Sequence, residues 1–434
     1  MIRWQEADQA HSARWRSESG NRPPKRVIVA DDTLTADAAY RLACEGTALL
    51  WRGDFQNAKQ LLQAMARRCD QKPARRRDQT QTRKSGAAND GISSKPVGGS
   101  SDRSKQKVRV SIDVEPSAAF NQYRQAQSQR ARTLAMLLIP FDADFTIPLR
   151  RAPDVKLACA NAWRGNVDVD ADADTDADAD ADADADTIHK GVSVASLREL
   201  LGIIGAHEWR RKGVEVAAIS DRVYPHYGVF APVRSEYIGL VANAPFANPI
   251  PAVAFDIGTG TGVLAALLAK RGILKIIATE LDSRALACAQ ENLSRMNLNN
   301  QVDVIRANLF PDKKYGKASL IVCNPPWLPA RPSSPIERAV YDPDNQMLRG
   351  FLSGLASHLT TDGEGWLILS DLAEHLGLRT RTQLLAWIDS AGLTVVGRID
   401  VRPTHPRASD HGDVLHSARA MEVTSLWQLK KTLL

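Results

Sequence analysis

Residues 254–263 read Ala-Phe-Asp-Ile-Gly-Thr-Gly-Thr-Gly-Val, and this segment is the strongest indication of the fold around it. An apolar strand pattern runs into three glycines at alternate positions, Gly258, Gly260 and Gly262, and a helical pattern follows. Glycine lets the backbone turn sharply and lets a ligand approach it closely. A tight turn without a ligand is the alternative, but three glycines at this spacing are costly unless something requires them. The stretch therefore predicts a ligand site where the helix begins.

One position of this loop bears on the identity of the ligand. A dinucleotide site has the pattern G-x-G-x-x-G, which requires glycine at position 263. That position is Val263, and the pattern here is D-x-G-x-G-x-G, beginning at Asp256. A second acid, Glu280, ends the segment KIIATE 24 residues after Asp256. A carboxylate at this point can accept hydrogen bonds from both hydroxyl groups of a ribose.

A tetrapeptide with its own chemistry, Asn324-Pro325-Pro326-Trp327, follows the apolar segment SLIVC. Ligands of open parallel sheets bind beyond the carboxyl ends of the strands, so we expect this tetrapeptide near the glycine loop. The Asn324 side-chain oxygen and the Pro325 carbonyl can each accept a hydrogen bond from a substrate N–H, and the prolines fix the backbone that holds them. Trp327 offers a flat stacking face. The set selects an NH₂ group attached to a conjugated, planar system.

Residues 252–434 alternate apolar strands with helical stretches. The strand patterns are VAFDIG, KIIATE, VDVIRANLF, ASLIVC, GWLILS and LTVVGRIDV. Strands that alternate with helices of roughly 10–15 residues indicate an α/β fold with a parallel, doubly wound sheet.

Together, the glycine loop and the tetrapeptide resemble the motifs of class I S-adenosylmethionine-dependent methyltransferases with N-P-P-[YFW], of the "methyltransferase small" type. This group includes release-factor glutamine methyltransferases, ribosomal-RNA guanine methyltransferases and adenine-specific DNA methyltransferases. The resemblance implies a Rossmann-like, mostly parallel sheet and S-adenosylmethionine as cofactor. It also implies that the tetrapeptide holds the acceptor nitrogen with its lone pair toward the sulfonium methyl, and that the nitrogen loses its proton after the transfer.

The resemblance assigns two sets of site residues. Glycines of the loop approach the amino-acid end of the cofactor, Glu280 its ribose, and Asn308, where the family commonly has Asp, its adenine amino group. The cofactor-binding set is Asp256, Gly258, Thr259, Gly260, Gly262, Glu280, Asn308 and Asn324. The catalytic set is Asn324, Pro325, Pro326 and Trp327, in which Trp replaces the more usual Tyr or Phe.

The methyl acceptor stays open between two classes. Residues 341–355 resemble a stretch of the glutamine methyltransferases, with departures at Arg349 and Ser353, and residues 232–236 resemble their R-P-[ST]-E element. We therefore expect methyl transfer to a planar amide or amino nitrogen. The macromolecular acceptor is a protein glutamine, in a translation factor or a ribosomal protein, or an exocyclic amine of an RNA or DNA base. The alternative from another functional class is a non-catalytic module that binds S-adenosylmethionine.

The first half of the chain predicts a helical domain with insertions. Residues 35–68 show helical spacing around a turn at 52–54, which indicates a helical hairpin. Segment 72–107 has ten basic and three acidic residues, and 168–186 holds ten aspartates that alternate mostly with alanine. Neither can join a core, so we expect a disordered linker, which could tether nucleic acid, and an expanded surface loop. The predicted parts are a polar tail (1–33), a helical hairpin (34–71), a disordered basic linker (72–107), the remainder of the N-terminal domain (108–166), an Asp-Ala loop (167–187), a helical lead-in (188–251) and the catalytic domain (252–434).

Composition excludes several other classes of protein. The five cysteines are scattered without C-x-x-C spacing, and His405, His411 and His416 lack the spacing of a compact metal site, so we expect neither disulfides nor a metal. No apolar run reaches about 18 residues, and the first residues lack an apolar core, so we expect no membrane span, no secretory signal and a cytoplasmic location. The net charge of +6 becomes +16 once the −10 of the ten aspartates is set aside. A basic body of this kind could bind nucleic acid, but diffuse positive charge is more common than a binding face.

Overall fold

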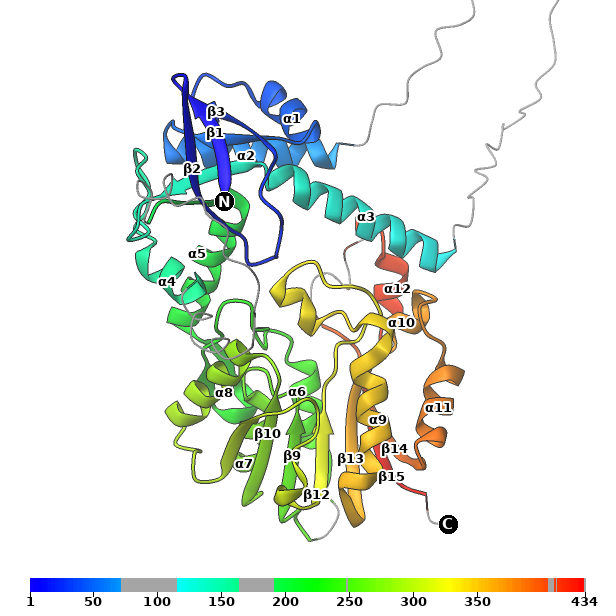
Figure 1. Cartoon of the computed structure of the whole chain (residues 1–434). Coiled ribbons are helices and arrows are strands. Elements are labelled where there is room, and N and C mark those ends of the chain that lie inside the picture. Colours follow the sequence, from blue (N-terminus) through cyan, green and yellow to red (C-terminus); the bar gives the residue numbers. More distant parts are fainter. Residues whose placement is uncertain (72–114, 164–190, 247–248, 405–409, 411, 433–434) are drawn as a thin grey trace, which may run out of the picture.

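The computed structural model describes residues 1–71, 115–163, 191–246, 249–404, 410 and 412–432. The predicted basic linker at 72–107 and the Asp-Ala loop at 167–187 lie outside these residues, as do His405 and His411. The described chain forms two large sheets, each with its own helices, and one small two-stranded sheet, and the N-terminal large sheet lies above the C-terminal one in Figure 1.

The C-terminal sheet has seven strands within the described residues, in the order β11-β10-β9-β12-β13-β15-β14. The first five strands in this order pair in parallel, whereas β15 runs antiparallel to both β13 and β14. The strands are β9 (Val253–Ile257), β10 (Lys275–Glu280), β11 (Val302–Arg306), β12 (Ala318–Cys323), β13 (Leu359–Ser370), β14 (Leu393–Val401) and β15 (Thr424–Lys431). This arrangement confirms the predicted Rossmann-like, mostly parallel α/β fold.

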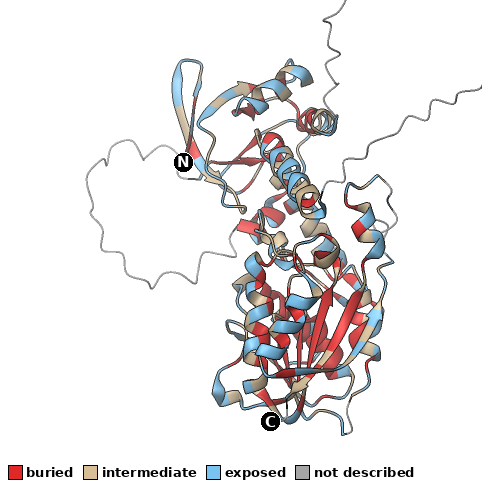
Figure 2. Cartoon of the chain, turned by 90° about the vertical axis from the view of Figure 1, so that its right-hand side faces the viewer, coloured by how far each residue is buried: buried red, intermediate tan, exposed pale blue. Residues whose placement is uncertain are grey.

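Helices cover both faces of this sheet. One buried cluster joins α6 and α7 to the sheet, and another joins α9 and α11 to its opposite face. Because both faces are covered, the strands read as continuous apolar runs, and Figure 2 shows them buried. The helices are α6 (Glu236–Asn243), α7 (Val263–Lys270), α8 (Ser283–Arg295), α9 (Gln346–His358), α10 (Leu372–His375), α11 (Arg381–Ser390) and α12 (His416–Met421). Short elements are β7 (Val214–Val216), β8 (Asp221–Val223) and the 3₁₀ turns η1 (Ala217–Ile219), η2 (Lys313–Tyr315), η3 (Pro335–Ala339) and η4 (Pro343–Asn345).

The N-terminal part is a second α/β unit rather than the helical domain that we predicted. Its sheet has the order β1-β2-β6-β5-β4-β3, with β3, β4 and β5 parallel. The strands are β1 (Ile2–Glu6), β2 (Gln9–Arg16), β3 (Arg26–Ala30), β4 (Thr47–Trp51), β5 (Leu137–Phe141) and β6 (Ser193–Ser196). The helices are α1 (Ala36–Cys44), α2 (Phe55–Asp70), α3 (Pro116–Leu134), α4 (Lys156–Trp163) and α5 (Leu197–Lys212).

The polar tail predicted for residues 1–33 is wrong, because this segment supplies β1, β2 and β3. In β1, the buried side chains Ile2 and Trp4 alternate with polar ones. Such a strand hides only every second side chain, so a short example has too few apolar residues to stand out from a polar tail.

The helical hairpin predicted for residues 34–71 is wrong in its middle. Both helices are present as α1 and α2, but Thr47–Trp51 between them is β4, a strand in which all five residues are buried. A continuous apolar run of this length fits either a buried helix segment or a buried strand, and periodicity alone does not separate the two. Gly46, with φ +79°, ends α1 and turns the chain into the strand.

Helix α3 extends from the N-terminal unit across to the C-terminal one, where it lies near α10 and α12 (Figure 1). Phe120, on the N-terminal half of α3, is 2% exposed and packs in one cluster with Leu328, Leu372 and Leu415 of the C-terminal unit. This apolar contact holds the N-terminal unit against the carboxyl edge of the larger sheet.

Candidate active site at the carboxyl edge of the larger sheet

A cavity of about 630 Å³ opens at the carboxyl ends of β9, β10 and β12. Its lining brings together residues of the glycine loop, the end of β10 and the tetrapeptide after β12. The predicted site residues in the lining are Gly258, Thr259, Glu280, Asn324, Pro325, Pro326 and Trp327. The cavity lies where open parallel sheets bind their ligands.

The three glycines of the loop have different surroundings, although all have positive φ angles of +71°, +60° and +83°. A side chain at Gly258 would place its Cβ 2.6 Å from Met347 Cε, and one at Gly262 would meet Leu293 at 3.2 Å. At Gly260 the same construction meets no described heavy atom within 4 Å. Gly258 and Gly262 therefore allow close packing, whereas Gly260 borders open space.

Asp256 holds the glycine loop in place from its buried side. The side chain is 1% exposed, and one of its carboxylate oxygens accepts hydrogen bonds from Thr259 Oγ1 at 2.6 Å and from Ala265 N at 3.0 Å. Among the described residues, the cavity lining does not include Asp256. The residue thus ties the loop to the first turn of α7 and leaves the cavity to other side chains.

Burial raises the pKa of Asp256 to about 6, against an ordinary value of 3.8. Between these values the folded protein holds more protons than the unfolded chain, so its stability falls as pH rises. Asp256→Asn removes this titration, and a carboxamide oxygen can still accept both hydrogen bonds. From about pH 4 to pH 6, the wild type should lose on the order of 2 kcal/mol of unfolding free energy relative to the variant. Urea unfolding at several pH values measures this difference, and parallel pH curves for the two proteins would contradict the prediction.

Glu280 lies in the lining, and both of its oxygens are already engaged. Oε2 accepts a hydrogen bond from Gly260 N at 3.0 Å, and Oε1 accepts from Leu281 N at 2.9 Å and Asp282 N at 3.2 Å. Burial raises the pKa of this carboxyl. Each carboxylate oxygen has about two acceptor sites, so the group can hold the loop and still receive a hydroxyl of a ligand.

Four predicted cofactor residues are not part of the cavity lining among the described residues, namely Asp256, Gly260, Gly262 and Asn308. Asn308, which follows β11, is exposed. The assignment of an adenine contact to Asn308 stays a prediction.

The tetrapeptide makes a contact that the sequence did not indicate. Trp327 Nε1 donates a hydrogen bond to Asn324 Oδ1 at 2.9 Å, and the half-buried indole packs against both core clusters of the sheet. The carboxamide oxygen has two lone pairs, so one remains for a second donor. Pro325 is buried and holds the turn between these two side chains.

A buried polar group at the far side of the cavity was missed by sequence reasoning. Glu422 is 1% exposed, lines the cavity and accepts a hydrogen bond from Ser370 Oγ at 2.7 Å. Arg234, in the segment that resembled the R-P-[ST]-E element, pairs with it at 3.8 Å. The sequence element at residues 232–236 pointed to Arg234. Glu422 belongs to no motif, and its place in the cavity depends on the pairing of β15 beside β13.

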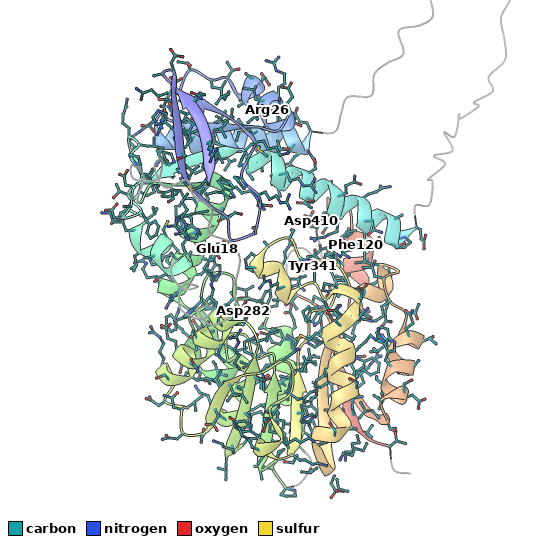
Figure 3. The ribbon with its side chains drawn as sticks, in the orientation of Figure 1. Glu18, Arg26, Phe120, Asp282, Tyr341 and Asp410 are labelled. Atoms are coloured by element: carbon teal, nitrogen blue, oxygen red, sulfur yellow. The ribbon has the colours of Figure 1, made fainter. Side chains whose placement is uncertain are left out.

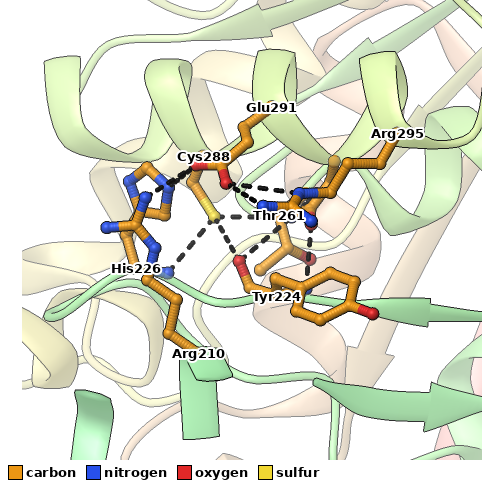
Figure 4. A network of polar contacts seen from close by, with 8 residues as sticks. Arg210, Tyr224, His226, Thr261, Cys288, Glu291 and Arg295 are labelled. Atoms are coloured by element: carbon orange, nitrogen blue, oxygen red, sulfur yellow. Dashed lines mark hydrogen bonds and ion pairs between the residues drawn. The ribbon is translucent and has the colours of Figure 1, made fainter. Parts of the chain in front are cut away.

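A network behind the glycine loop fixes the segment that enters this region (Figure 4). Asn292, 1% exposed on α8, donates to the Thr261 carbonyl at 3.0 Å and accepts from Tyr224 N at 2.8 Å. His226 contacts Glu291 Oε2 at 2.7 Å. Residues 224–226, α8 and the glycine loop are thereby held as one unit.

Two further observations concern metal ligands and membrane spans. No group of three or more His, Cys, Asp or Glu side chains that could hold a metal ion occurs among the residues that the structure describes. In the same residues, none of the helices is both long and apolar enough to cross a membrane.

Comparison with known proteins identifies the type of domain that holds this cavity. Residues 226–377 match the family model described as methyltransferase small domain. The chain is 45% identical over 91 residues to a tRNA1(Val) (adenine(37)-N6)-methyltransferase of Glaesserella parasuis, covering 21% of this chain and 37% of that relative. An enzyme of the same name from Bacteroides thetaiotaomicron is 30% identical over 126 residues, covering 28% and 53%. A ribosomal protein L11 methyltransferase of Desulforamulus reducens is 39% identical over 69 residues, covering 16% and 22%.

The chain thus spans at most about half the length of these curated relatives. The range that matches the family model contains the core of the cavity. The matched range runs from the segment before α6 to the end of α10 and includes the glycine loop, Glu280 and the tetrapeptide. Residues 226–377 of this chain therefore form a methyltransferase small domain, of the class I S-adenosylmethionine-dependent type.

Proposed function

We propose that the chain is an S-adenosylmethionine-dependent N-methyltransferase that acts on an exocyclic amino nitrogen of a nucleic-acid base, with transfer RNA as its acceptor in the cytoplasm. The observation that carries this proposal is the single cavity that holds both Glu280 and the Asn324-Pro325-Pro326-Trp327 tetrapeptide. The two relatives named as tRNA adenine-N6 methyltransferases support the choice of acceptor.

The residues present fit S-adenosylmethionine. The cavity volume of about 630 Å³ falls within the range of roughly 300–1,000 Å³ that is common for small-molecule sites. Gly260 leaves open space that a side chain would fill, and Oε2 of Glu280, which accepts one hydrogen bond from Gly260 N, has a second acceptor site for a ribose hydroxyl. When bound, the cofactor supplies an electrophilic methyl group on a sulfonium.

The chain's own groups would orient the acceptor. Asn324 Oδ1, with one lone pair held by Trp327, would accept one N–H of the acceptor amine, and the Pro325 carbonyl would accept the other. The base would stack on Trp327, and the nitrogen lone pair would face the methyl carbon. Transfer of the methyl group would form the N–C bond as the C–S bond breaks, and the nitrogen would then release one proton to solvent. The contribution of the protein is orientation rather than strong base catalysis.

A protein side chain is the second candidate acceptor. The similarity to a ribosomal protein L11 methyltransferase favours it, as does the 341–355 stretch that resembles glutamine methyltransferases. An amide NH₂ presents the same planar donor group to the tetrapeptide as a base amine does.

One experiment separates these acceptors. The purified full chain would be incubated with methyl-labelled cofactor and, separately, with total tRNA, ribosomal RNA, DNA and total ribosomal protein. We expect label in tRNA, sensitive to nuclease and recovered as an N-methylated nucleoside. Label confined to protein would replace this acceptor with the second candidate. A protein that binds the cofactor but labels none of the four would support a non-catalytic binding module.

Glu280→Ala tests the cofactor end of the site. Loss of a carboxylate acceptor should raise the dissociation constant for S-adenosylmethionine roughly ten- to a hundredfold, because hydrogen bonds to charged groups contribute about 1.5–3 kcal/mol. Turnover should recover partly at high cofactor concentration. Calorimetric titration measures the affinity. Glu364→Ala is the matched control, since that carboxylate also accepts side-chain hydrogen bonds but lies outside the lining. Equal affinities in the two variants would contradict the assignment.

A further inference from the structure

Helix α3 of the N-terminal unit forms one wall of the cavity beside the tetrapeptide. Four of its residues are in the lining, Phe120, Tyr123, Arg124 and Gln127. Phe120 packs in a buried cluster with Leu328, the residue directly after the tetrapeptide, and Tyr341 lies against the same cluster (Figure 3). The wall of the cavity therefore includes a helix that lies outside the matched domain at 226–377.

Arg124 is the residue through which α3 holds the C-terminal unit by polar contacts. Its guanidinium donates to the Arg331 carbonyl at 2.9 Å and pairs with Glu337 Oε2 at 3.3 Å. The same group lies over the Tyr341 ring, 4.0 Å from its centre. The side chain is 19% exposed, so these contacts are largely shielded from solvent. A planar guanidinium suits this combination of stacking and paired hydrogen bonds, which an ammonium group does not reproduce.

The partners of Arg124 all lie in one segment, residues 331–341, which follows the tetrapeptide. This segment is the outer part of a loop whose base is closed immediately after Trp327. Leu328 N donates to the Val340 carbonyl at 3.2 Å, and Asp342 N donates to the Leu328 carbonyl at 2.9 Å. Arg124, which belongs to the N-terminal unit, therefore holds this loop in place. The hydrogen-bonded pair at the base of the loop includes Leu328, which directly follows Trp327.

We propose that α3 is part of the acceptor site and that Arg124 is a positioning residue for methyl transfer. By holding residues 331–341, Arg124 keeps Leu328 and thus Trp327 in the orientation in which an acceptor base stacks beside Asn324. This inference rests on the proposed function. It gives the N-terminal unit a role in the reaction, namely to complete the acceptor side of the cavity while leaving the cofactor side to the glycine loop and Glu280.

The test compares Arg124→Ala with Arg130→Ala. Arg130 is on the same helix and makes an equivalent ion pair, at 2.8 Å to Asp70, but it does not line the cavity. With total tRNA as the acceptor, Arg124→Ala should lower kcat/KM roughly ten- to a hundredfold, because small displacements of a positioned group have effects of this size. The dissociation constant for S-adenosylmethionine should stay within about twofold of the wild type. Arg130→Ala should change neither value, although both variants lose one ion pair.

Two further measurements make the outcome decisive. Hydrogen–deuterium exchange in residues 328–341 should rise in Arg124→Ala and stay unchanged in Arg130→Ala. Arg124→Lys should recover only part of the activity, because the charge remains and the planar stack on Tyr341 is lost. Unchanged exchange, or activity equal to that of Arg130→Ala, would overturn the proposal. If the wild type labels no tRNA, the proposed function fails, whereas the exchange experiment still decides whether Arg124 holds the loop.

Discussion

Asn324→Ala should lower kcat for methyl transfer roughly ten- to a thousandfold while the affinity for S-adenosylmethionine stays within about threefold of the wild type. The carboxamide is the side-chain acceptor that would hold the substrate N–H, and losing a positioned, desolvated hydrogen bond costs on the order of 1–3 kcal/mol, with further loss from misorientation. The variant also removes the acceptor of Trp327 Nε1, so the stacking face would be less well fixed. Steady-state kinetics with labelled cofactor, together with calorimetry, measure both quantities.

Trp327→Phe separates the two consequences of the Asn324 change. Phenylalanine keeps a flat face but has no N–H, so it releases the second lone pair of Asn324 Oδ1. We expect kcat within about fivefold of the wild type for this variant, because stacking is retained and orientation of the nitrogen is unaffected. If Asn324→Ala kept full turnover, or if added cofactor rescued its defect, Asn324 would be a structural residue of the turn.

The C-terminal fold was predictable because its signals are local and strong. VAFDI, KIIATE and ASLIVC are apolar over most of their length, since both faces of the sheet are covered, and glycines or long helices separate them. The N-terminal sheet was not predictable by the same reading. Ile2–Glu6 buries only alternate residues, and Thr47–Trp51 is an apolar run between two real helices, so neither gave a period that identifies a strand.

The candidate site also has residues whose place could be predicted from the sequence and residues whose place could not. The place of Glu280 and the tetrapeptide in the cavity lining was predictable, because each stands at the carboxyl end of a strand and the fold brings those ends together. Asp256 was found for its position in the motif, but only its burial, with bonds to Thr259 and Ala265, shows that it supports the loop from beneath. Arg124 and Glu422 reach the cavity through tertiary packing of a distant helix and of the last strand, and no spacing along the chain records such contacts.

Gly260→Val should weaken S-adenosylmethionine binding by roughly a hundredfold or more. The Cβ at this position would enter space that holds no described heavy atom within 4 Å, and the amide of the same residue is the one that Glu280 accepts. A branched side chain there would occupy the path of the cofactor beside its ribose acceptor. A loss of about 3 kcal/mol corresponds to a hundredfold change in affinity. Isothermal calorimetry gives the dissociation constant, and thermal unfolding reports whether the variant folds.

Backbone strain is the competing explanation, because valine at φ +60° is unfavourable wherever it occurs. Gly392→Val provides the matched control. Gly392 has φ +66°, its Cβ would also meet no described heavy atom within 4 Å, and it lies at the exposed turn between α11 and β14, at the opposite edge of the sheet from the glycine loop. Both variants should therefore lose a similar 1–3 kcal/mol or so of stability. Only Gly260→Val should lose cofactor binding, and a folded Gly260→Val protein with wild-type affinity would show that the cofactor does not pass beside Gly260.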